Sequence, residues 1–139
     1  MPDPLVQVIV DFTDIGTIQS TLLTIGCNGS GAEASLDSMY ETCSHADSLL
    51  GLHWNMNANA LVFTFTDEPP QTYVTPPTDG LMITDACLEH GVLPFIWSLS
   101  PTEFRPIVQA ANGIHFSIVN DWEQIFNDMN SIVITLCGS

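Results

Sequence analysis

Positive charge is almost absent from this sequence. Its 139 residues include 16 acidic side chains but only one basic side chain, Arg105, which leaves a formal net charge of −15. Nucleic acids and anionic membrane surfaces are bound through Lys and Arg, so this charge argues against both as partners. It favours cations, basic partners, or a saline setting in which salt screens the self-repulsion of the chain.

Long apolar runs are missing as well. No run reaches the ~18 residues that a membrane-spanning helix needs, so we expect no membrane insertion. The first four residues, Met1 to Pro4, lack the basic and apolar regions of a signal peptide. If the protein is exported, we therefore expect this chain to be a mature product, a fragment or an expressed segment.

The cysteines follow no metal-binding or CxxC spacing. They are Cys27, Cys43, Cys87 and Cys137. An even number permits two disulfides, and three pairings are possible. Cys43 and Cys87 lie on apolar stripes of predicted helices, which suits buried free thiols equally well.

The remaining pattern predicts one globular α/β domain over residues 1–139. Apolar residues make up 45% of the chain, enough for a buried core at this length. Strands are predicted at 5–10, 60–65, 92–99 and 114–119. Helices are predicted at 15–25, 32–50, 83–90, 101–111 and from 122 onward, and the second is clearest up to Cys43. This alternation indicates parallel βαβ units, and hence a doubly wound, mostly parallel sheet flanked by helices.

Local signals mark the helix ends. Gly91 is expected to close the helix at 83–90. A capping box of Ser100 and Glu103 is expected to open the next helix, with Pro101 at its first position. Asn120 or Asp121 is predicted to cap the last helix. Its stripe is predicted to pack in the core through Trp122, Ile125, Phe126 and Met129.

Oxygen-bearing side chains follow the predicted strands. In open α/β sheets, ligands bind at the carboxyl ends of the strands. Oxygen ligands suit Mg²⁺, Ca²⁺ or Mn²⁺. The residues concerned are Asp11, Thr13, Asp14, Thr66, Asp67, Glu68, Ser98, Ser100, Asn120 and Asp121.

Signals for catalysis are weak by comparison. The glycine-rich loop at 26–31 follows a helix and has no lysine, so a phosphate cradle is not indicated. The four histidines are scattered, which disfavours a zinc site. Neither Ser30 nor Ser35 stands in a nucleophile elbow. We therefore predict that the protein is not an enzyme.

Two stretches resemble a known family. Residues 29–37, GSGAEASLD, resemble the "GGGD-PEA-LDAL" stretch of von Willebrand factor A domains and of the related domains in integrin β-subunits. Residues 61–70, LVFTFTDEPP, resemble the strand that ends in "TDAPP" in that family. The tail from Gly91 to Met129 is similar to the last two strand–helix units. The resemblance implies a Rossmann-like fold of the von Willebrand factor A type.

The resemblance also implies a site for a divalent cation, Mg²⁺ or Ca²⁺. A carboxylate from the partner completes the coordination of this cation. Carried over by residue, two of the family's ligands fall on Glu33 and Asp67. The family's DxSxS triplet is absent, and Ala32 stands where an Asp is common. Either the chain begins after the triplet, or Asp11-Phe12-Thr13 is a degenerate form of it with Ile15 at the last position. The site is therefore predicted as degenerate, with Asp11 and Thr13 as the weakest members.

Loss of the family's first strand has a consequence for partners. The strand at 60–65 would then expose an unpaired edge, which a partner, a second copy or residues 5–10 could complete. The resemblance implies an extracellular or cell-surface adhesion and protein-binding module. The alternative is a structural subunit of an extracellular assembly or filament without a functional metal site.

Overall fold

Three parallel strands form the centre of the protein. The computed structural model describes residues 16–17, 20, 34–44, 59–119 and 121–138. Its strands are β1 (Ala60–Thr66), β2 (Val92–Ser98) and β3 (Ile114–Ser117), in the order β1-β2-β3. Both pairings are parallel. The α/β class and the parallel sheet are therefore confirmed for this part of the chain.

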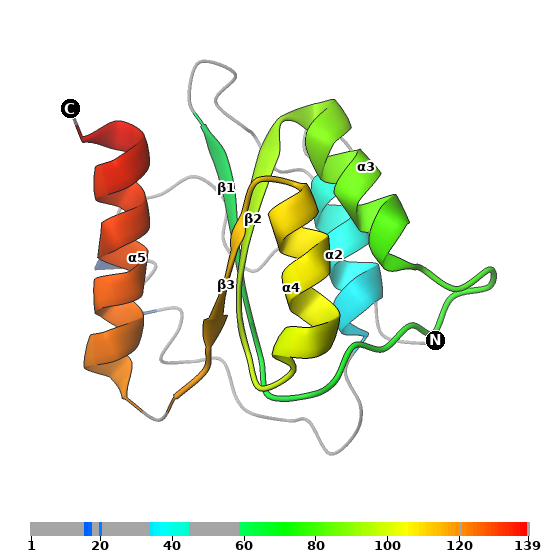
Figure 1. Ribbon diagram of the computed structural model, residues 1–139, viewed down its shortest axis with the longest axis horizontal. Helices are drawn as coiled ribbons and strands as arrows, with labels where there is room; N and C mark the ends of the chain where they lie inside the picture. Colours follow the sequence, from blue (N-terminus) through cyan, green and yellow to red (C-terminus); the bar gives the residue numbers. More distant parts are fainter. Residues whose placement is uncertain (1–15, 18–19, 21–33, 45–58, 120, 139) are drawn as a thin grey trace.

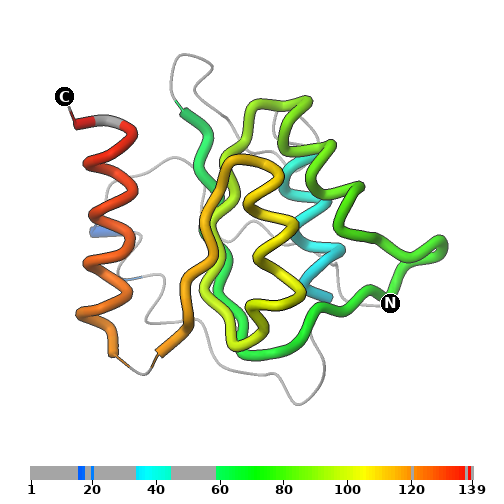
Figure 2. Tube along the Cα trace, viewed as in Figure 1, coloured from blue at the N-terminus to red at the C-terminus, as the bar shows by residue number. Residues whose placement is uncertain are grey.

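Helices cover both faces of this sheet (Figure 1). One face carries α2 (Ser35–Ser44), α3 (Gly80–His90) and α4 (Pro101–Ala110), and α5 (Trp122–Cys137) lies on the other. The tube in Figure 2 shows the same separation of α5 from the other three helices. Within the described residues, no helix combines the length and apolar character needed to cross a membrane.

Some predicted elements lie outside the described residues. These are the strand at 5–10, the loop at 26–31 and the continuation of the second helix beyond Ser44. Of the helix predicted at 15–25, the structure describes Gly16, Thr17 and Ser20, and all three are helical.

Alternation along β2 divides the core into two clusters. Val92 and Ile96 point to α2, α3 and α4, where they meet Phe104 and Val108 of α4. The predicted stripes on α2 and α3 complete this cluster with Met39, Cys43, Ile83, Ala86 and Cys87. Phe95 and Trp97 point the other way and pack against Ile132 of α5.

A row of aromatic rings crosses the sheet under α5. Phe65, Trp97 and Phe116 are register partners on the three strands. The Trp97 ring stacks on both neighbours, with centroid separations of 4.8 Å to Phe65 and 4.8 Å to Phe116. Its indole Nε1 donates a hydrogen bond of 3.1 Å to Oδ2 of Asp128 on α5. The buried central strand is thereby bonded to the helix above it.

The helix ends follow the predicted signals with one exception. Gly91 ends α3 in the left-handed region, with φ of 65°, and the Asp121 carboxylate caps α5. Ser100 occupies the N-cap position of α4, but its side chain makes no capping hydrogen bond. The expected capping box is therefore wrong. The backbone N–H of Ser100 instead donates to Oγ of Ser98, which ties the turn to the end of β2.

The core prediction for α5 is also partly wrong. Trp122 is 78% exposed and Phe126 is 60% exposed. Ile125 and Met129 do pack on the sheet, and the buried stripe continues through Ile132 and Leu136. These four positions recur at i, i+4, i+7 and i+11, so α5 is rotated to place them inward. Trp122 and Phe126 stand at the border of that stripe and remain outside.

The first prediction concerns the turn before β3. A Cβ at Gly113 would lie 1.7 Å from the carbonyl oxygen of Pro94, whereas a Cβ at Gly91 meets nothing within 4 Å. We expect Gly113→Ala to lower the free energy of unfolding by at least about 3 kcal/mol, because backbone must move. Gly91→Ala, the control, carries only the left-handed strain of about 1–2 kcal/mol. Urea unfolding measures both, and equal losses would contradict the assigned packing of β3.

Candidate functional site

The carboxyl ends of the strands meet at one edge, as the sequence predicts. Thr66 and Ser98 are register partners there, and Ser98 pairs in turn with Ser117. The side-chain oxygens are engaged locally. Thr66 Oγ1 accepts a hydrogen bond of 3.1 Å from the Glu68 N–H. Ser98 Oγ accepts a hydrogen bond of 3.2 Å from the Ser100 N–H, so Thr66 and Ser98 each close the turn that follows their own strand.

Of the four predicted metal residues, the structure describes only Asp67. Asp67 follows β1 and is exposed. Glu33, Asp11 and Thr13 lie outside the described residues. In the ranges that the structure describes, no group of three or more His, Cys, Asp or Glu side chains could hold a metal ion.

Asp37 is a buried carboxylate on α2. In the sequence it stands out only as the last residue of the stretch 29–37, which resembles the von Willebrand factor A family. Its Oδ1 accepts a 2.6 Å hydrogen bond from the Thr72 hydroxyl, and its Oδ2 accepts one of 2.7 Å from the Tyr73 N–H. Burial by itself would raise the pKa of Asp37, but the hydrogen bonds outweigh it and hold the pKa below its ordinary value. Asp37 therefore fixes the loop between β1 and α3 to α2.

A serine–histidine contact lies near the same sheet edge. Ser98 Oγ and His115 Nε2 are 2.8 Å apart, and both residues are buried. His115 Nδ1 is buried without a hydrogen-bond partner. Burial, followed by the charge of Arg105, lowers the pKa of His115. The imidazole is therefore held in its neutral form at neutral pH.

This contact lacks the parts of a nucleophilic site. In a catalytic triad, an acceptor on Nδ1 orients the imidazole, and the serine is open to substrate. His115 has no such acceptor and Ser98 is fully buried. The pair therefore joins β2 to β3. Sequence reasoning treated His115 as one of four scattered histidines, although its place within a strand of apolar residues was a signal of burial.

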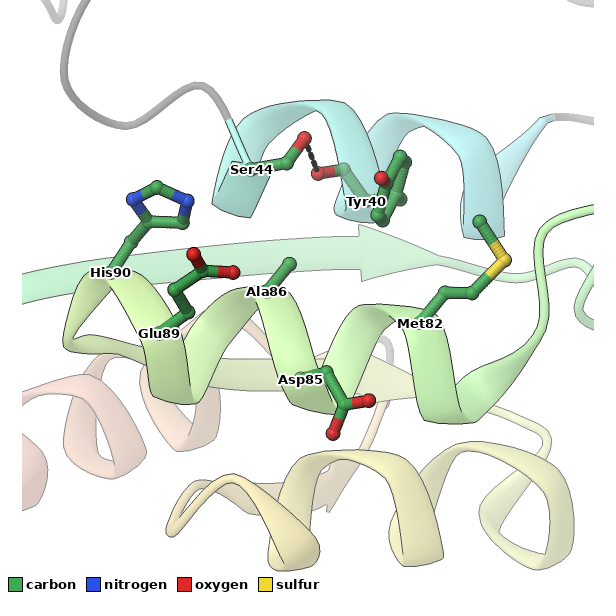
Figure 3. A pocket seen from close by; sticks show the side chains of 7 residues that line it. All are labelled: Tyr40, Ser44, Met82, Asp85, Ala86, Glu89 and His90. Atoms are coloured by element: carbon green, nitrogen blue, oxygen red, sulfur yellow. Dashed lines mark hydrogen bonds between the residues drawn. The ribbon is translucent and has the colours of Figure 1, made fainter.

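A surface pocket lies between α2 and α3 (Figure 3). Its volume is about 250 Å³, below the roughly 300–1,000 Å³ of sites for drug-sized ligands. Figure 3 shows Tyr40 and Ser44 on the α2 side, with Met82, Glu89 and His90 facing them from α3. The pocket marks the seam between the two helices.

An exposed apolar strip lies on α5. We define the α5 strip as Trp122, Phe126, Val133 and Ile134, all of which are exposed. Asp121 and Glu123 flank its N-terminal end and are exposed as well. Single exposed apolar residues are ordinary, but two large aromatic rings one helical turn apart indicate a contact surface.

Comparison of this chain with protein families, with curated proteins and with solved structures found no match in any of the three.

The second prediction concerns His115. Unfolding restores its pKa toward the ordinary value of 6.5, so the unfolded chain takes up the proton first. The stability that neutral His115 contributes is present above pH 6.5 and is lost as pH falls through the lowered pKa of the folded state. We expect His115→Gln to lose less stability than the wild type between pH 7.5 and pH 5.5.

Urea unfolding at the two pH values measures this difference. His90→Gln is the matched control, because it removes a histidine from the end of α3 and leaves the Ser98–His115 contact intact. Identical pH dependence in the wild type and in His115→Gln would show that His115 does not carry this effect.

Proposed function

We propose that this chain is a non-enzymatic protein-binding module whose α5 strip docks a partner with an apolar stripe flanked by basic residues. The observation that carries the proposal is the exposure of Trp122 and Phe126 on a helix whose inward stripe packs on the sheet. Tryptophan is among the residues that contribute most to binding energy in protein interfaces.

The strip is held in a rigid position. Asp128 receives hydrogen bonds from Trp97 in the sheet and from Gln124 one turn earlier on α5. Ile132, which belongs to the same helix, is buried against the sheet. A partner would therefore meet a surface that is already ordered, which lowers the entropy cost of binding.

Charge selects the kind of partner. A second copy of this chain would bring another net charge of −15, and Asp121 and Glu123 would repel their counterparts near the strip. A partner with Lys or Arg around an apolar stripe is attracted instead. We therefore favour a basic partner over self-association.

The narrower form of the proposal is a domain of the von Willebrand factor A type in an extracellular setting. Support comes from the parallel sheet flanked by helices and from the position of Asp67 directly after β1. In this form Glu33 and Asp67 belong to a degenerate Mg²⁺ or Ca²⁺ site. The α5 strip does not depend on that site.

The third prediction tests the strip with a designed probe. A labelled amphipathic helical peptide of Leu and Lys should bind the protein, and a Leu–Glu peptide of the same pattern should not. The double variant Trp122→Ser/Phe126→Ser should weaken the Leu–Lys complex at least tenfold, about 1.4 kcal/mol. Fluorescence anisotropy of the peptide measures the dissociation constants.

A matched double variant separates the strip from general stickiness. Leu81 and Leu88 on α3 are 68% and 52% exposed, so Leu81→Ser/Leu88→Ser removes comparable apolar surface elsewhere while keeping the charge. We expect it to bind the Leu–Lys peptide as the wild type does. Equal losses in the two double variants would mean that the peptide binds exposed apolar surface in general, and no loss in either would mean that charge alone holds it. The proposal would fail in both cases.

The fourth prediction separates the strip from the cation site. We expect EDTA to leave the affinity for the Leu–Lys peptide unchanged, because the contact is apolar and electrostatic. Glu33→Ala and Asp67→Ala should likewise keep it, with buffers matched in ionic strength because salt screens a chain of this charge. A loss on chelation that Mg²⁺ restores, and that Asp67→Ala abolishes, would move the binding site to the sheet edge.

A further inference from the structure

Two cysteines face each other in the core. Cys43 lies on α2 and Cys87 on α3, and both are fully buried free thiols. Their Sγ atoms lie 2.6 Å apart. Both belong to the cluster that also holds Met39, Ile83 and Val92. The seam between α2 and α3 is therefore built around a pair of sulfur atoms.

The separation of these sulfur atoms is too short for simple packing. Two carbon atoms in van der Waals contact already lie about 3.5–4.0 Å apart, and sulfur is larger than carbon. Both helices thus bring their cysteines closer than apolar packing requires. Approach of this kind is what a covalent link between the two side chains needs.

We propose that Cys43 and Cys87 form a disulfide that links α2 to α3 under oxidising conditions. The oxidant is a small-molecule disulfide such as glutathione disulfide. One of the two cysteines, as its thiolate, attacks one sulfur of the oxidant, forms a mixed disulfide and releases one thiolate. That thiolate takes the proton of the other cysteine, whose sulfur then attacks the first and releases the second thiolate, which takes up the proton that the first cysteine lost. The two cysteines lose two electrons, and the oxidant becomes two thiols.

The contact between the thiols makes them titrate as a pair. Their hydrogen bond lowers the pKa of Cys87 and raises that of Cys43, where burial acts in the same direction. In the closed seam the two sulfur atoms therefore share one proton when the pair carries its first negative charge.

The link would join two helices that already pack together. Among the described elements, α2 packs mainly on α3, with a smaller contact to β1. Hydrogen bonds also join its first turn to the loop that follows β1, through Asp37 and through Ser35 and Leu36. A bond from Cys43 to Cys87 closes a loop that contains all of β1 and most of α3, so it restricts the unfolded chain strongly.

The surface pocket lies on the same seam as the two cysteines. The pocket in Figure 3 is lined by Ser44 and Ala86, the chain neighbours of Cys43 and Cys87. Because both sulfur atoms are buried, exchange requires a local opening of α2 from α3. We expect oxidation to be slow in the folded protein and specific once it occurs.

Peptide mapping tests the link in the unmodified chain. Trypsin is unsuitable because Arg105, the sole basic residue, precedes Pro106. Cleavage before aspartate places the four cysteines on four peptides, 14–36, 37–46, 85–120 and 128–139. The folded protein is equilibrated with glutathione disulfide, alkylated without reductant, cleaved and analysed by mass spectrometry. We expect peptide 37–46 to be linked to peptide 85–120.

Thermal unfolding provides a second readout. The oxidised protein should melt on the order of 10 °C above the reduced protein. This difference should vanish in Cys43→Ala and in Cys87→Ala, and persist in Cys27→Ala and Cys137→Ala. Full alkylation of Cys43 and Cys87 after oxidation, or linkage of either to Cys27 or Cys137, would overturn the proposal.

Discussion

The near absence of positive charge constrains how this fold uses its carboxylates. With one basic residue for 16 acidic ones, most buried or capping carboxylates must be satisfied by neutral N–H and O–H donors. Asp37 takes its donors from a loop, and Asp79 and Asp121 take theirs from helix N-termini. Asp128 takes an indole N–H. These acids act as acceptors that organise turns and helix ends, a role that ordinary salt does not screen as it screens exposed ion pairs.

Trp97 shows how one such acceptor connects the two faces of the domain. Trp97 lies on the central strand, between the rings of Phe65 and Phe116. These two stacking contacts fix the plane of its indole ring independently of α5. A single hydrogen bond to Asp128 then sets the position of α5 along the sheet. The inward stripe of α5 adds the apolar contact. The outward direction of Trp122 and Phe126 therefore agrees with both contacts, the inward stripe and the bond from Trp97 to Asp128.

The sequence predicts the regular elements well and the side-chain partners poorly. Periodicity and turn signals located β1, β2, β3 and the helices within a few residues, because both depend on neighbours along the chain. The apolar residues of α5 cover a wide part of its circumference, and which of them face inward depends on the sheet that the helix packs on. Trp122 and Phe126 were therefore wrongly predicted to lie in the core. The contact of Ser98 with His115 and that of Cys43 with Cys87 arise between elements distant in sequence. Of the predicted metal residues, Asp67 alone lies in the described part, and the cation site stays a prediction.

High negative charge also offers a reason why an apolar strip can remain exposed on α5. Apolar contact between two copies would bring Asp121 and Glu123 of each within the ~8 Å over which charges interact at physiological salt. The repulsion opposes association before the apolar surfaces can meet. A basic partner reverses the sign of this effect and gains the apolar contact in addition. In the proposed interface the charge and the α5 strip therefore act together: the charge opposes contact between copies of the chain, and the strip supplies the apolar contact with a basic partner.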